Sequence, residues 1–224
     1  MQKKARKHLN VVTEEVEKYL NKIQRARDPV LLSLEKDAEE NDVPILGPLV
    51  GNFLSIIVQA CNAKNVLEVG TATGYSGIWL ARATSANSGK LTTIEMDPDR
   101  KKIAERAFVK AGLINNVEMI LGDAGKEVPE IAQSRPGQFD LVFMDVGDKK
   151  LYEELIDSCI RALKTGGLFI ADDTLYRGVA IPSVGQKKTK TMRKFNKIMF
   201  ADERLKPSII PLGDGLTVAV KISD

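Results

Sequence analysis

The sequence contains few of the residues that enzymes most often use for nucleophilic and metal chemistry. Its 224 residues include one histidine, His8, and two cysteines, Cys61 and Cys159. A single histidine excludes a multi-histidine metal site, and the polar N-terminal segment around His8 argues against a triad built on it. Both cysteines lie in apolar helical patterns, so we expect buried thiols in a reducing compartment and no disulfide.

The sequence also lacks long apolar runs and a strong net charge, and it has few aromatic residues. No run is long enough to cross a bilayer, and the N-terminal MQKKARKHLNVV has no signal-peptide core. We therefore expect a cytoplasmic protein with no membrane partner. Aromatic residues make up 5% of the chain and the net charge is +3, which leaves little to argue for nucleic acid.

What the chain does contain is an alternation of strand and helix patterns. Such alternation predicts an α/β domain with a mostly parallel sheet and helices on both faces. Strands are expected at 65–69, 91–95, 117–121, 139–145 and 167–172, and helices at 76–83, 98–111, 124–133 and 152–163. Residues 208–212 and 216–222 flank a three-residue turn, which allows only an antiparallel pair.

The first 48 residues differ from the rest of the chain. Polar amphipathic helices are expected at 11–25 and 28–40, before the first strand, and a further helix at 49–60. We expect one domain over residues 1–224, with a helical extension over 1–48 and a core over 49–224.

The most informative stretch is VLEVGTATGYS at 66–76, where an apolar strand ends in a glycine turn before a helix. Glycines at such a turn let the backbone approach a ligand closely. The dinucleotide fingerprint needs glycine at two further places, which here hold Ala72 and Tyr75. A pyrophosphate site is therefore disfavoured, and a tight turn without a ligand is the alternative.

Acidic residues follow the later strands. Glu95 closes the second strand a little over 20 residues after the glycine turn, where a carboxylate can accept both ribose hydroxyls. Two neighbouring strands end in Asp145 and in the pair Asp172 and Asp173. Three oxygen donors meeting at one sheet edge suit a hard divalent ion, although a single such aspartate is often only a helix cap.

Taken together, these motifs resemble a known family. The turn is similar to the first motif of class I S-adenosylmethionine (SAM) methyltransferases, with Ala72 at their usual middle glycine. From Leu49 to Lys221, including the GDGLT turn at 213–217, the chain resembles the cation-dependent O-methyltransferases typified by the caffeoyl-CoA and catechol enzymes. The resemblance implies a Rossmann-like fold with seven strands, a SAM cofactor, a divalent cation and a homodimer.

The resemblance also implies roles for individual residues. The implied metal ligands are Asp145, Asp172 and Asp173, with Mg²⁺ expected first and Mn²⁺ or Ca²⁺ as alternatives. The residues implied to contact SAM are Glu68, Gly70, Thr71, Gly74, Tyr75, Ser76, Glu95, Met96, Asp123, Ala124 and Asp145.

The chain departs from the family pattern at two places. Asp173 stands where the family usually has asparagine, and an added carboxylate should bind the cation more tightly but weaken its Lewis acidity. In DVGDKKLY (145–152) the family's lysine is displaced by one position. A one-residue insertion near Gly147 assigns the catalytic role to Lys149 beside Asp145; Lys150 and a pair of solvated lysines are the alternatives.

The predicted function is methyl transfer from SAM to a hydroxyl of a small molecule with vicinal oxygens, of the catechol type. A hydroxyuridine of tRNA is a second acceptor, because basic residues occur at Lys3, Lys4, Arg6 and Lys7 and along 187–194. Two other classes of protein are weaker alternatives. They are a nucleotide-dependent oxidoreductase and a cofactor-binding subunit without metal chemistry.

Overall fold

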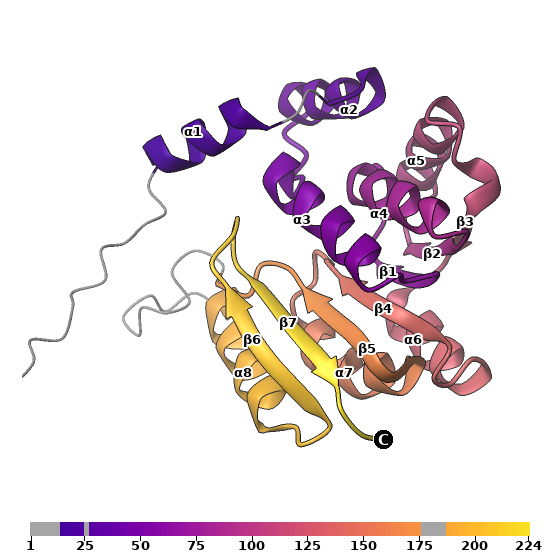
Figure 1. Cartoon of the computed structure of the whole chain (residues 1–224), viewed down its shortest axis with the longest axis vertical. Helices are drawn as coiled ribbons and strands as arrows, with labels where there is room; N and C mark the ends of the chain where they lie inside the picture. The colour runs from indigo at the N-terminus through magenta and orange to yellow at the C-terminus, as the bar shows by residue number, and fades with distance from the viewer. Residues whose placement is uncertain (1–13, 25–26, 176–186) are drawn as a thin grey trace, which may run out of the picture.

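A computed structural model describes residues 14–24, 27–175 and 187–224. Its centre is a seven-stranded sheet in the order β3-β2-β1-β4-β5-β7-β6. The strands are β1 (Asn65–Val69), β2 (Lys90–Glu95), β3 (Val117–Leu121), β4 (Phe139–Met144), β5 (Leu163–Ala171), β6 (Leu205–Ile210) and β7 (Leu216–Lys221). Strands β1 to β5 pair in parallel, and β7 pairs antiparallel with β5 and β6 (Figure 1). The seven-stranded sheet and its antiparallel end are thereby confirmed.

Helices cover both faces of this sheet (Figure 1). They are α1 (Glu14–Ile23), α2 (Pro29–Glu40), α3 (Gly47–Ala60), α4 (Tyr75–Ala86), α5 (Pro98–Lys110), α6 (Ala124–Ser134), α7 (Lys150–Ala162) and α8 (Lys187–Ala201), with a short 3₁₀ turn at Ile114–Asn116. No helix in the described parts of the chain is long and apolar enough to span a membrane.

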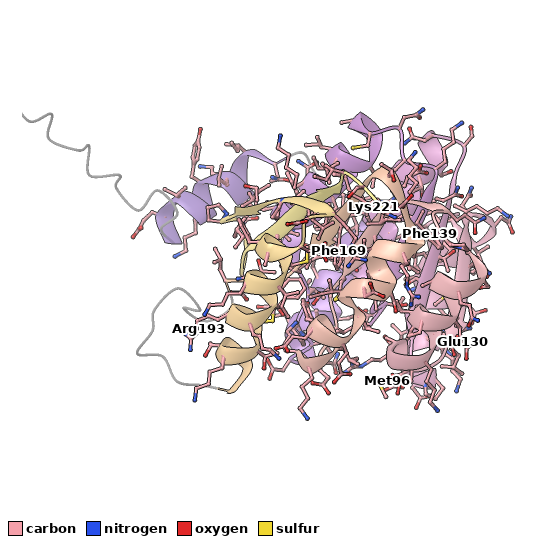
Figure 2. All side chains as sticks on the ribbon, turned by 90° about the horizontal axis from the view of Figure 1, so that it is seen from below. Met96, Glu130, Phe139, Phe169, Arg193 and Lys221 are labelled. Carbon is pink, nitrogen blue, oxygen red and sulfur yellow. The ribbon has the colours of Figure 1, made fainter. Side chains whose placement is uncertain are left out.

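The two faces are filled by alternate residues of each strand, because successive side chains of a strand point to opposite sides. Leu141 and Phe143 of β4 pack with α2 to α5, whereas Val142 and Met144 pack with α6 to α8. Figure 2 shows Phe169 of β5 inside the second of these layers. Both faces of the sheet are therefore shielded from solvent by helices, as is typical of a largely parallel sheet.

The N-terminal extension is attached to the core through α2. Leu31 and Leu34 of this helix are buried against the α3–α4 side of the sheet. Asp28 caps the helix by accepting hydrogen bonds from Val30 N and Leu31 N. The basic residues of the extreme N-terminus, and His8, lie outside the described residues.

Three expectations need correction or completion. Cys61 is exposed, because it follows the last residue of α3 instead of lying within its buried face; Cys159 is buried, as expected, and both thiols are free. Strand β5 begins at Leu163, four residues before the predicted start. Helix α8 was not predicted as a helix, because its residues read mainly as a basic stretch.

Candidate active site

The glycine turn lies where the strand order reverses, at the carboxyl ends of β1 and β4. In open α/β sheets this switch point is where ligands bind. Gly70 follows β1 with φ of +104°, and a Cβ built on it would lie 2.0 Å from the carbonyl oxygen of Asp145. Only glycine fits here, because the backbone after β1 lies in direct contact with the backbone after β4.

The turn itself is held by backbone hydrogen bonds. The amides of Gly70 and Thr71 donate to Ile94 O at 3.2 and 3.0 Å. Gly74 takes a left-handed conformation at the N-cap of α4, and Ala72 also has a positive φ, of +47°. The alanine that replaces the family's middle glycine therefore adopts a backbone conformation that favours glycine.

A buried carboxylate lies beneath the turn. Glu68 accepts hydrogen bonds from the Ser76 hydroxyl at 2.5 Å and from the Thr93 hydroxyl at 2.6 Å. Burial raises the pKa of Glu68 to about 7, against the lowering effect of these two hydroxyls. The Thr71 hydroxyl also contacts Thr93, at 2.6 Å, so the predicted residues Glu68, Thr71 and Ser76 belong to one buried network.

Glu95 ends β2 at the rim of the turn. Its two carboxylate oxygens accept hydrogen bonds from Ala72 N at 2.7 Å and Asp97 N at 2.9 Å. Each oxygen retains a lone pair, so the carboxylate can accept further hydrogen bonds from a diol. Met96 beside it is 70% exposed, and Figure 2 shows it at the periphery of the molecule.

Two other predicted cofactor residues are engaged in structural contacts. Asp123 is exposed and caps α6, which begins at Ala124, by accepting from Gly125 N at 2.8 Å. The Tyr75 hydroxyl donates to Glu35 of α2 at 2.7 Å, and its side chain is buried. The structure thus directs the Tyr75 hydroxyl toward the N-terminal extension.

The aspartates of β4 and β5 meet at the same edge of the sheet. Asp145 N donates to Val69 O at 2.9 Å, and Asp172 N donates to Met144 O at 3.0 Å. Asp145 is the first residue after β4, and Asp172 is the first residue after β5. Burial raises the pKa of Asp145, and raises that of Asp172 to about 8, with their mutual repulsion contributing to the latter.

Lys149 lies directly against these aspartates. Its side chain is 6% exposed, and Nζ lies 2.5 Å from a carboxylate oxygen of Asp173 and 3.7 Å from one of Asp145. Nζ also donates to Val146 O at 2.9 Å and to the Tyr152 hydroxyl oxygen at 3.1 Å. Lys150 is exposed, so the structure places Lys149, and not its neighbour, among the aspartates.

The donor types fit a hard divalent cation, since carboxylate oxygens are the ligands that Mg²⁺ prefers. As arranged, however, no three histidine, cysteine or acidic side chains among the described residues form a metal-binding group. The Asp173 carboxylate is instead paired with the Lys149 ammonium. The carboxylate groups are therefore of the type that suits the cation, while two of them contact the Lys149 ammonium.

The C-terminal hairpin supports the segment after β5. The carbonyl of Gly215 accepts from both the amide and the hydroxyl of Thr174, at 2.9 and 3.0 Å. Asn196 of α8 donates to Thr174 O at 2.8 Å and contacts Thr217. The GDGLT turn therefore fixes the chain immediately after the aspartate pair.

Several residues of the site escaped the sequence reasoning. Thr93 lies within a strand and had no signal beyond its polarity in an apolar run. The contacts of Lys149 with the Val146 carbonyl and with Tyr152 could not be foreseen from sequence, because the first partner is a backbone atom and Tyr152 reads as a core aromatic. Glu35 contacts Tyr75 across 40 residues of chain.

Comparison with known proteins places these features in a family. A family model described as O-methyltransferase matches residues 25–222. A catechol O-methyltransferase of Niastella koreensis is 31% identical over 219 residues, which is 94% of this chain and 98% of that protein.

Solved structures agree with this assignment. An O-methyltransferase from Bacillus cereus in complex with SAH has a TM-score of 0.82 at 26% identity, covering 92% of this chain and 97% of its own. TomG of Streptomyces achromogenes, an O-methyltransferase in complex with SAM, has a TM-score of 0.81 at 26% identity, with 93% and 96% covered. The chain therefore belongs to the class I SAM-dependent O-methyltransferase family.

Proposed function

We propose that this enzyme moves the methyl group of SAM to a hydroxyl of a small molecule that carries two adjacent oxygens, as a catechol does, with the help of a divalent cation. The observation that carries the proposal is the meeting of Asp145, Asp172, Asp173 and Lys149 at the sheet edge that also bears the glycine turn. The catechol O-methyltransferase named above supports the class of acceptor.

The chemical problem is to obtain a phenolate at neutral pH. A phenol resembles the tyrosine side chain, whose pKa is about 10, so little of it is ionised. Asp145, Asp172 and Asp173 would hold a divalent cation, which would supply the Lewis acidity that favours the ionised form of an acceptor hydroxyl beside a second oxygen. The buried Lys149 adds a positive charge near the same point and can hold the developing anion.

The methyl donor is placed by the glycine turn. We assign the ribose hydroxyls to Glu95, whose carboxylate keeps free lone pairs, and the adenine to the exposed apolar surface of Met96 with Asp123 and Ala124. We assign the methionine end of SAM to the turn that contains Gly70, Gly74 and Ser76. In-line transfer then requires that the acceptor oxygen be held in line with the methyl group and sulfur of SAM.

We also propose a cytoplasmic homodimer whose subunits join through helices α1 to α3. Support comes from large apolar side chains exposed on α1 to α3, which a partner would cover. These are Tyr19, Ile23, Leu32 and Ile56.

The test compares catechol with phenol as acceptors of labelled methyl from SAM. We expect kcat/KM for catechol to exceed that for phenol by at least about 100-fold, because one hydroxyl cannot supply two ligands. Asp145→Asn should abolish the difference, whereas Asp148→Asn, at an exposed position three residues away, should preserve it. Equal rates for the two acceptors would reject the vicinal-oxygen assignment.

A further inference from the structure

The Lys149 ammonium is held in a pocket made of oxygen atoms. Its four oxygen contacts come from two carboxylates, one carbonyl and one hydroxyl, at 2.5 to 3.7 Å. These are the donor types that a hard divalent cation uses. A side chain that is 6% exposed has exchanged almost all of its water for this pocket.

Two of the four contacts are with proposed metal ligands. Asp173 and Asp145 supply both of the charged oxygens, and Asp173 supplies the shortest contact. A divalent cation bound by the same carboxylates would lie within a few ångströms of the ammonium. At that range like charges repel strongly, so the two cations cannot both occupy these oxygens.

The remaining contacts of Lys149 are with groups that are not proposed metal ligands. The Val146 carbonyl lies 2.9 Å from Nζ, the Tyr152 hydroxyl 3.1 Å, and the centroid of the Tyr152 ring 4.6 Å. Tyr152 is fully buried and packs edge-on against Phe195 at 5.3 Å. The carbonyl, the hydroxyl and the ring face can all stabilise an ammonium that has left the carboxylates.

The charges of the cluster agree with such an exchange. With a cation bound and all three aspartates ionised, the aspartates and Lys149 would sum to a charge of minus two, which one divalent cation neutralises. With the family's asparagine at position 173, the same four positions would sum to minus one. The extra carboxylate of this chain therefore compensates for a lysine that contacts the metal ligands.

We propose that Lys149 is a built-in competitor of the divalent cation. In the cation-free protein its ammonium pairs with Asp145 and Asp173. Cation binding breaks these two contacts and leaves the ammonium on Val146 O and the Tyr152 hydroxyl, which it already contacts. This inference rests on the proposed function, because it takes the three aspartates as the cation site. It predicts a cation that binds less tightly than three carboxylates alone would hold it.

The experiment measures Mn²⁺ binding, by the electron paramagnetic resonance of free Mn²⁺, to the full-length protein without acceptor. Lys149→Met removes the ammonium but keeps the length of the side chain, and should bind Mn²⁺ at least about tenfold more tightly than the wild type. Lys149→Arg keeps the charge and should bind as the wild type does. Lys150→Met is the matched control, since Lys150 is exposed, and should change nothing.

A second measurement covers the case in which Lys149→Met does not fold without its charge. In wild-type protein labelled with ¹³C at lysine Cε, the Lys149 signal, assigned by its loss in Lys149→Arg, should shift on addition of Mg²⁺. The other lysine signals, Lys150 included, should stay in place.

The outcomes separate the two proposals. Tighter Mn²⁺ binding by Lys149→Met, or a Mg²⁺-induced shift confined to Lys149, supports the exchange. Wild-type binding of Mn²⁺ with no gain in Lys149→Met, and no shift of the Lys149 signal, overturns the exchange but leaves the cation site intact. Absence of Mn²⁺ binding in every variant overturns both the exchange and the cation dependence.

Discussion

Asp173 and Lys149 form an ion pair of 2.5 Å at the carboxyl ends of the neighbouring strands β4 and β5. Asp173 has a φ of +61°, a conformation that asparagine and aspartate tolerate better than most residues. Lys149 lies at the N-cap of α7, just after β4, and its ammonium contacts a carboxylate that an asparagine at position 173 would lack. Each of these two side chains therefore supplies the other's counter-charge.

Removal of this counter-charge should destabilise the cation-free protein. Asp173→Asn keeps the shape and the backbone conformation but leaves Lys149 with only the more distant Asp145. We expect a loss of about 1–3 kcal/mol in the free energy of unfolding. Urea denaturation in EDTA measures it, with the exposed Asp148→Asn as control. If Asp173→Asn and the control unfold alike, the ion pair contributes nothing.

Ala72 offers a test of the glycine turn. Its φ of +47° costs an L-residue about 1–2 kcal/mol, while glycine gains unfolded-state entropy worth about 0.4–1 kcal/mol. Ala72→Gly should therefore stabilise the protein or leave it unchanged. Ala86→Gly, at an exposed helical position of α4, should instead destabilise by up to about 1 kcal/mol. Thermal unfolding distinguishes them, and an equal loss in both would show that Ala72 is not strained.

Glu95 should control the affinity for SAM. In Glu95→Gln the amide nitrogen cannot accept a hydrogen bond, so either Ala72 N or Asp97 N loses its partner and one ribose acceptor disappears. We expect the Kd for SAM to rise at least about tenfold by calorimetry, since a charged hydrogen bond contributes about 1.5–3 kcal/mol. Glu105→Gln, on the solvent side of α5, is the control. An unchanged Kd would remove Glu95 from the cofactor site.

Glu68 should make stability depend on pH. Its pKa rises from 4.5 to about 7 on folding, so the folded protein binds more protons than the unfolded chain between these values. Stability due to this group is then present below about pH 4.5 and is lost as pH rises to about 7. Relative to Glu68→Gln, the wild type should lose roughly 1–3 kcal/mol between pH 5 and 8. Parallel stability curves would place the Glu68 pKa near its ordinary value.

The fold followed from sequence where local patterns and tertiary packing agreed. Strands β1 and β3 match their predicted bounds, because apolar residues there end at a glycine turn or an acidic turn. Helix α8 was missed because its buried residues Met192, Phe195 and Met199 are dispersed among lysines. The early start of β5 was missed because Lys164 to Gly166 are exposed and carry no apolar signal.

Sequence alone predicted which residues form the site, but it did not predict which of their side chains contact one another. The three aspartates and Glu95 could be predicted as site residues because they follow strand ends, and the carboxyl ends of parallel strands lie at one edge of the sheet where ligands bind. Which of two adjacent lysines turns inward depends on the path of the loop after β4, which sequence does not specify. The pairing of Tyr75 with α2 likewise depends on how the extension packs on the core.

Cation dependence is the central claim, and one rate measurement tests it most directly. Methyl transfer from SAM to catechol is followed in Mg²⁺, after removal of the ion with EDTA, and after replacement with Mn²⁺. The account predicts at least about a 100-fold loss in EDTA and recovery with either ion, because the acceptor hydroxyl is then rarely ionised. An equal rate in EDTA, with SAM still bound, would contradict it.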